Sequence, residues 1–101
     1  MCRQKEGGSS MAVKRKRITF TGRVQGVGFR YRASFIAQNL GLTGWVKNEW
    51  DESVTAEAQG EEDVIDLFVE RMYRERYIRI EGMDVVTIPL QEKEKGFRIA
   101  Y

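Results

Sequence analysis

The most constraining feature of this sequence is the glycine-rich segment Gly22–Arg30, which reads Gly-Arg-Val-Gln-Gly-Val-Gly-Phe-Arg. It follows a stretch in which Ile18 and Phe20 alternate with threonines, a pattern typical of a β-strand. It precedes a stretch with apolar residues at helical spacing. The segment is therefore predicted to connect a strand to the start of a helix, with glycines that allow a ligand to approach the backbone closely.

A strand-to-helix turn of this kind is a candidate anion site. Successive backbone N–H groups can form a concave nest, and the helix dipole adds positive potential at the same point. Arg30 falls in the first helical turn, where a cation is unfavourable against the dipole but its forked donors match phosphate oxygens. We therefore expect the loop and Arg30 to hold a phosphoryl group. The pattern alone is equally compatible with a plain turn that carries surface arginines.

Two other glycine motifs do not fit this segment. A P-loop requires Lys and then Ser or Thr after its last glycine, whereas Gly28 is followed by Phe29 and Arg30. The dinucleotide-binding fingerprint requires a third glycine at the position that Tyr31 occupies. Neither motif is therefore predicted.

The rest of the chain contains two predicted helices. The first extends from Phe29 to Leu40, because apolar residues recur there at helical spacing and Gly41 can cap its end. The second begins after Gly60, with acidic residues at its start and arginines at its end. Its buried stripe is predicted to consist of Val64, Leu67, Phe68 and Met72.

Further strands are predicted over Trp45–Asn48, Val54–Gln59, Met83–Ile88 and Phe97–Tyr101. The order strand, helix, strand, strand, helix, strand, with one extra strand, is that of an α+β ferredoxin-like sandwich. This fold places two helices on one face of an antiparallel sheet of four to five strands. A chain of 101 residues is expected to form one domain. We expect this domain over residues 14–101, after a flexible extension over residues 1–13 that contains a Gly-Gly-Ser-Ser linker.

The composition excludes several kinds of chemistry. The chain has no His and a single Cys, Cys2, so we expect no Ser-His triad, no imidazole catalysis, no metal site and no cofactor. The lone Cys fits a reducing compartment, and we expect the cytoplasm. No apolar run reaches the roughly 20 residues of a membrane span, and no secretory signal is evident. A net charge of +2 is too small to indicate nucleic acid by itself.

The segment Gly22–Arg30 closely resembles the signature loop of the acylphosphatases. The segments Gly41–Asn48 and Gly96–Tyr101 resemble the same family, so the resemblance covers about Lys16 to Tyr101. It implies the ferredoxin-like fold. It also implies an enzyme that hydrolyses the carboxyl–phosphate bond of acyl phosphates to a carboxylate and inorganic phosphate, without a metal.

The resemblance also implies roles by position. Arg30 matches the family's phosphate-binding arginine, and Asn48 matches the asparagine that orients the attacking water. The backbone amides that match the family's phosphate cradle are those of Gln25, Gly26, Val27, Gly28, Phe29 and Arg30. The implied partners are a small-molecule acyl phosphate and inorganic phosphate. No nucleic acid or membrane partner is expected, and the chain is expected to be a monomer.

Some features depart from the family's usual pattern. Glu52 stands where the hairpin after the second strand often has glycine, and Glu49 and Asp51 add negative charge nearby. The Gly-Pro-Pro segment that is frequent before the fourth strand is replaced by Tyr77-Ile78-Arg79-Ile80. These departures concern the shape of the loops and the preference among substrates.

Hydrolysis of an acyl phosphate suits a chain without His, because the carboxylate leaving group needs no general acid. Two other functions stay open. A nucleic-acid-binding module would need exposed aromatic residues on the sheet and a broad basic face. The cluster Lys14–Arg17 could contribute to such a face, although a solvated strand entry is the simpler interpretation. A ligand-binding or regulatory domain would keep the anion site without turnover.

Overall fold

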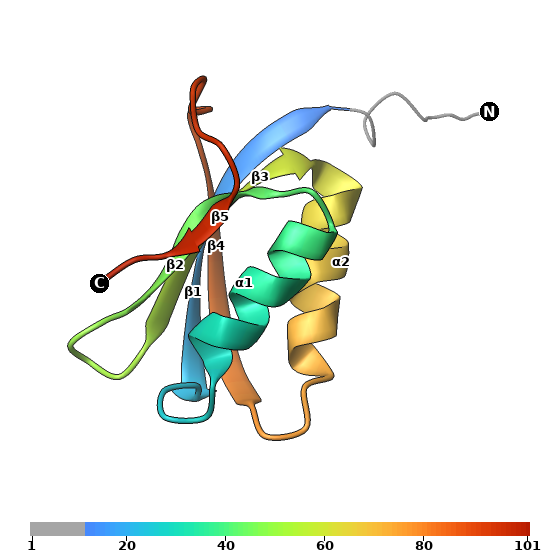
Figure 1. Cartoon of the computed structure of the whole chain (residues 1–101). Helices are drawn as coiled ribbons and strands as arrows, with labels where there is room; N and C mark the ends of the chain where they lie inside the picture. Colours follow the sequence, from blue (N-terminus) through green and yellow to red (C-terminus); the bar gives the residue numbers. More distant parts are fainter. Residues whose placement is uncertain (1–11) are drawn as a thin grey trace.

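The computed structural model describes residues 12–101, which form a five-stranded sheet and two helices (Figure 1). The elements in chain order are β1 (Val13–Arg23), α1 (Phe29–Asn39), β2 (Thr43–Asn48), β3 (Val54–Glu61), α2 (Glu62–Tyr73), β4 (Arg79–Ile88) and β5 (Phe97–Ile99). The predicted α+β ferredoxin-like fold is confirmed. Most of the expected extension lies outside the described residues, but Val13 already belongs to β1. Neither helix in the described part of the chain has the length and apolar character needed to cross a membrane.

The strands lie side by side in the order β4-β1-β3-β2-β5, and both helices cover one face of the sheet (Figure 1). The pairs β1–β3, β1–β4 and β2–β3 are antiparallel, whereas β5 joins β2 in parallel. The sheet is therefore mixed at one edge rather than wholly antiparallel as predicted. The physical reason is the path of the chain. The last residue of β4 and the first residue of β2 lie at the same end of the sheet. The segment 89–96 crosses to the far edge at this end, so β5 starts beside β2 and runs in the same direction.

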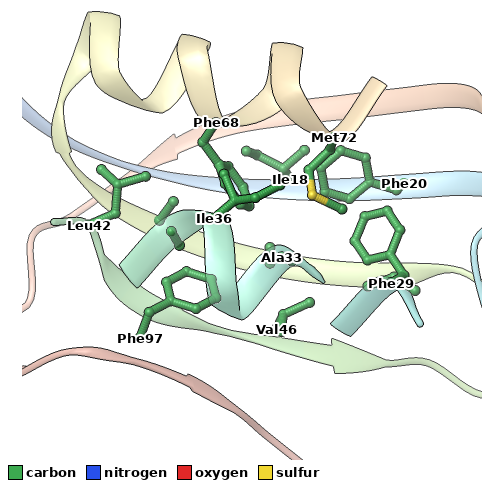
Figure 2. Close-up of a cluster of buried hydrophobic side chains, with 14 of the residues drawn as sticks. Ile18, Phe20, Phe29, Ala33, Ile36, Leu42, Val46, Phe68, Met72 and Phe97 are labelled. Atoms are coloured by element: carbon green, nitrogen blue, oxygen red, sulfur yellow. The ribbon is translucent and has the colours of Figure 1, made fainter. Parts of the chain in front are cut away.

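The core lies between the sheet and the helices (Figure 2). Helix α2 buries Ile65, Phe68 and Met72, whereas Val64 is only partly buried at the margin of the core. The predicted burial of Leu67 is wrong, since this residue is only partly buried and Ile65 takes its place. The predicted and the observed buried residues of α2 both have helical spacing. The rotation of the helix against the sheet, and not the periodicity, therefore decides which side chains are buried.

Strands β1 and β4 are longer than the alternation of their apolar residues predicts. Strand β4 begins at Arg79, opposite Arg23, and the pairing shifts register between Thr21 and Gly22. Charged residues and a glycine occupy the first positions of β4, and these residue types conceal a strand from pattern analysis. The two strands therefore continue together down to the start of the glycine-rich loop.

The basic cluster Lys14–Arg17 is divided between the two faces of the sheet. Lys16 faces α2, where its Nζ lies 2.8 Å from a carboxylate oxygen of Glu62. The solvated strand entry that the sequence predicts is wrong for Arg15, which lies on the opposite face and is only 1% exposed. Its Nε donates to Glu57 Oε1 at 2.9 Å and its Nη1 donates to Glu94 Oε1 at 2.7 Å. Arg15 therefore ties the crossing segment 89–96 to the sheet.

The environment of Arg15 keeps its guanidinium charged. Burial works against the charge, but hydrogen bonds and Coulomb attraction from Glu94 and Glu57 outweigh it and raise the pKa of Arg15 above its ordinary value. A second arginine, Arg17, donates from Nε to the other oxygen of Glu57 at 3.0 Å, but its side chain is half-exposed. The same carboxylate is thus shared by a buried and a solvated cation.

Replacing these two arginines should separate burial from charge. Arg15→Leu should lower the free energy of unfolding by about 3 kcal/mol, because it removes one partner from a buried ion pair. Arg17→Leu should lower it by less than about 1 kcal/mol, because exposed pairs contribute little. Urea unfolding of both variants measures the difference. Equal losses would show that burial does not set the contribution of Arg15.

Candidate active site

The loop between β1 and α1 is fixed in the core at both ends. Phe20 of β1 and Phe29, the first residue of α1, are buried, and their ring centroids lie 4.9 Å apart (Figure 2). Within the loop, Val24 is fully buried and Val27 packs against the margin of the core. The packing of four apolar side chains therefore holds the loop in one place, although its glycines are exposed.

The turn leaves backbone donors at the start of α1. Gly26 and Gly28 have φ angles of 74° and 81°, in the left-handed region that favours glycine. Among the backbone hydrogen bonds of residues 12–101 outside regular elements, none has its donor between residues 25 and 31, and the first bond of the helix runs from Arg32 N–H to Gly28 O at 3.0 Å. The first turn of α1 contains no acidic residue. An anion can therefore accept these N–H groups at the positive end of the helix.

A cavity of about 190 Å³ lies beside this turn and brings Arg30 and Asn48 together. Arg30 comes from the first turn of α1, and Asn48 is the last residue of β2. The other lining residues are Val24, Gly26, Gly28, Phe29, Tyr31, Ile99 and Tyr101. Among the described residues, those that line this cavity include no Asp or Glu. No cluster of His, Cys, Asp or Glu suited to a metal ion occurs within residues 12–101.

Two residues of the predicted cradle, Gln25 and Val27, do not line the cavity. The side-chain Nε2 of Gln25 instead donates to the backbone oxygens of Glu49 at 2.8 Å and Ser53 at 2.9 Å. Both oxygens belong to the β2–β3 hairpin, which begins immediately after Asn48. The Gln25 side chain therefore holds the glycine-rich loop against the strand end that carries Asn48. No local pattern reveals this role, because the partners lie 24 and 28 residues away.

The C-terminal residue also belongs to the cavity. The guanidinium carbon of Arg30 lies 5.2 Å from the centroid of the Tyr101 ring, which is a cation–π distance. The parallel pairing of β5 with β2 carries the chain end to this point, and Ala100 N–H donates to Val46 O at 2.8 Å. The segment Gly96–Tyr101 resembles the family in sequence, but the sequence predicts no role for Tyr101.

The hairpin after Asn48 shows how the chain accommodates Glu52 in place of glycine. Glu52 has a φ of 75°, and among the described residues no other non-glycine residue has a positive φ. Asp51 Oδ1 accepts hydrogen bonds from Ser53 Oγ at 2.6 Å and from Ser53 N–H at 3.1 Å. These bonds lower the pKa of Asp51 below its ordinary value. The hairpin is thus held by a local Asp–Ser contact while Glu52 carries backbone strain.

Comparison with known proteins shows to which family this chain is similar. The family model described as acylphosphatase matches residues 16–99. An acylphosphatase of Clostridium acetobutylicum is 41% identical over 90 residues, which cover 88% of this chain and 99% of the relative. One of Geobacillus thermodenitrificans is 40% identical over 90 residues, covering 88% and 96%. The crystal structure of acylphosphatase from Bacillus subtilis is 35% identical with a TM-score of 0.81, covering 89% of this chain and 100% of that one.

The strain at Glu52 should be measurable. Glu52→Gly should raise the free energy of unfolding by about 0.5–1 kcal/mol, because glycine adopts the left-handed region without the penalty of a Cβ. Glu52→Ala keeps the Cβ and removes the carboxylate, so we expect a change within about 0.5 kcal/mol. Urea unfolding of both variants tests this. Equal stabilisation in both would assign the effect to the crowded carboxylates of the hairpin instead of the backbone.

Proposed function

The chain belongs to the acylphosphatase family, and we propose that it hydrolyses the carboxyl–phosphate bond of acyl phosphates to a carboxylate and inorganic phosphate. The observation that carries this proposal is a single small cavity lined by the glycine turn, the Arg30 side chain and Asn48. Phosphoryl transfer depends mainly on positioning and on stabilising charge, and these groups are suited to both tasks.

The phosphoryl group is bound by the loop and by Arg30. The N–H groups of residues 25–30 lie at the start of α1, and those that face the cavity donate to the phosphoryl oxygens. The Arg30 guanidinium adds two parallel donors, which match two oxygens of the same group. The Tyr101 ring supports the guanidinium from one side. Charge on the phosphoryl oxygens is thus met by donors that need no rearrangement.

The attacking water is oriented by the Asn48 side chain. The water oxygen forms a bond to phosphorus while the bond from phosphorus to the acyl oxygen breaks, and the electron pair of that bond leaves with the carboxylate. The carboxylate is a weak base and needs no proton on departure. The water proton passes to a phosphoryl oxygen, because the described residues that line the cavity offer no carboxylate to take it.

Gln25 acts as a positioning residue in this scheme. Its two hydrogen bonds to Glu49 O and Ser53 O join the loop that binds phosphate to the hairpin that follows Asn48. In-line attack requires the water oxygen to be held about 3–3.5 Å from the phosphorus and in line with the leaving oxygen. The Gln25 side chain maintains that separation between two segments that are distant in sequence.

The nucleic-acid alternative receives little support from the described residues. The cluster Lys14–Arg17 does not form a free basic face, because Arg15 is buried against Glu57 and Lys16 is paired with Glu62. A domain that binds anions without turnover differs from the proposed enzyme only in its rate. An assay with benzoyl phosphate therefore decides between the two.

The purified chain should hydrolyse benzoyl phosphate, in the presence of EDTA as well, and inorganic phosphate should inhibit competitively.

Arg30→Lys should lower kcat/KM by on the order of a hundredfold, because a point charge cannot reproduce the planar fork. The matched control is Arg32→Lys, since Arg32 lies in the same helix but is paired with Glu75 at 2.8 Å outside the cavity. Near-normal turnover in Arg30→Lys, or an equal loss in both variants, would remove Arg30 from the mechanism.

Replacing Asn48 should separate binding from turnover. Asn48→Ala should lower kcat by on the order of a hundredfold, the scale observed when one aligned polar group is removed. The inhibition constant of inorganic phosphate should change by less than about threefold, because the loop and Arg30 remain. Kinetic assays and thermal melting measure both effects. A parallel loss of phosphate affinity would make Asn48 a phosphate ligand, and a lowered Tm would make it a structural support.

A further inference from the structure

A second cavity, of about 410 Å³, lies between the end of β1 and the connection from α2 to β4. Figure 1 shows this connection at the same end of the sheet as the loop that precedes α1. The residues that line it are Arg23, Tyr73, Arg76, Tyr77, Ile78, Arg79 and Ile80. We call it the arginine–tyrosine cleft. It shares no lining residue with the active-site cavity, so it is a separate feature of the described surface.

The cleft carries three guanidinium groups and no lining carboxylate among the described residues. None of the ion pairs in this part of the chain involves Arg23, Arg76 or Arg79. The neighbouring acid Glu75 is engaged by Arg32 at 2.8 and 3.3 Å. Arg23 also lines a different cavity, together with Asp51, Glu52 and Glu81. None of these three carboxylates forms an ion pair with Arg23 within residues 12–101, so the positive charge of the cleft is available to an anionic ligand.

The arrangement of two of these arginines disfavours folding. Arg23 and Arg79 lie directly opposite each other on the paired strands β1 and β4. Like charges in facing positions destabilise a sheet. The strands are also closely packed here, because a Cβ added to Gly22 would lie 2.4 Å from Arg79 O. An anion bound between the two guanidinium groups would relieve this repulsion, and residues that violate a local rule in this way are expected at functional sites.

Two tyrosine rings complete the cleft. Tyr73 is 49% exposed and Tyr77 is 73% exposed, while Ile78 is buried beneath them. Exposed aromatic rings beside arginines provide stacking surfaces for planar groups and donors for phosphates. The segment Tyr77–Ile80 contributes four of the seven residues that line the cleft.

We propose that the arginine–tyrosine cleft binds a nucleotide, with its phosphates on Arg23, Arg76 and Arg79 and its base against Tyr73 or Tyr77. Arginine forks bind phosphate oxygens through two parallel hydrogen bonds. The volume of about 410 Å³ lies within the range of small-molecule sites. A mononucleotide can contact both the arginines, through its phosphates, and a tyrosine ring, through its base. A simple anion would contact the arginines alone.

Calorimetric titration with ADP at fixed ionic strength tests the position of the site. Arg76→Ala/Arg79→Ala should weaken ADP binding by about tenfold or more, because each arginine offers charge-assisted hydrogen bonds. The matched control Arg71→Ala/Lys95→Ala removes the same charge at two exposed positions outside the cleft, and affinity should stay within about threefold. Arg30→Ala, which removes the guanidinium from the active-site loop, should still bind ADP at the cleft. Equal weakening in the control pair, or complete loss of ADP binding in Arg30→Ala, would overturn the proposal.

Comparison of ADP with pyrophosphate tests the role of the rings. ADP should bind about fivefold more tightly than pyrophosphate, and Tyr77→Ala should remove most of this difference, because stacking on an aromatic ring stabilises a base. Equal affinities for ADP and pyrophosphate in the unaltered chain would reduce the cleft to an anion site and overturn the nucleotide assignment. Much tighter binding of a single-stranded RNA oligonucleotide than of ADP would overturn it in favour of a nucleic-acid surface.

Discussion

The contact between Phe20 and Phe29 is the interaction on which the active site depends. The two buried rings lie 4.9 Å apart, so the end of β1 and the start of α1 must meet and the chain between them must reverse direction. Left-handed glycines allow this reversal, and the turn leaves N–H groups without backbone acceptors in the described chain. The proposed anion site is therefore a consequence of how the core is packed. Disturbing the core at this contact would move the donors that face the substrate.

The two halves of the site come from separate segments and are joined by one side chain. The loop and Arg30 belong to the β1–α1 connection, whereas Asn48 ends β2. Gln25 bridges them through the backbone oxygens of Glu49 and Ser53. In the proposed mechanism this arrangement divides the work, since one segment binds the phosphoryl group and the other orients water. It also explains how a chain without His can support hydrolysis, because positioning and fixed donors supply the required stabilisation.

Much of the fold could be predicted from local pattern, because periodicity and residue type indicate the order of strands and helices and the position of the glycine turn. What could not be predicted depends on contacts between distant segments. Burial of Ile65 instead of Leu67 follows from the rotation of α2 on the sheet, and burial of Arg15 follows from the crossing segment 89–96. The side-chain role of Gln25 and the position of Tyr101 beside the cavity likewise depend on tertiary pairing.

Catalysis as proposed depends above all on binding of the phosphoryl group by backbone N–H groups of the β1–α1 turn. Titration with inorganic phosphate, followed by ¹H–¹⁵N NMR of the backbone amides, tests it directly. We expect the resonances of amides within residues 26–30 to shift together, with one dissociation constant equal to the constant for inhibition of benzoyl phosphate hydrolysis. If these resonances did not shift while phosphate still inhibited the reaction, the phosphoryl group would bind elsewhere than at this turn.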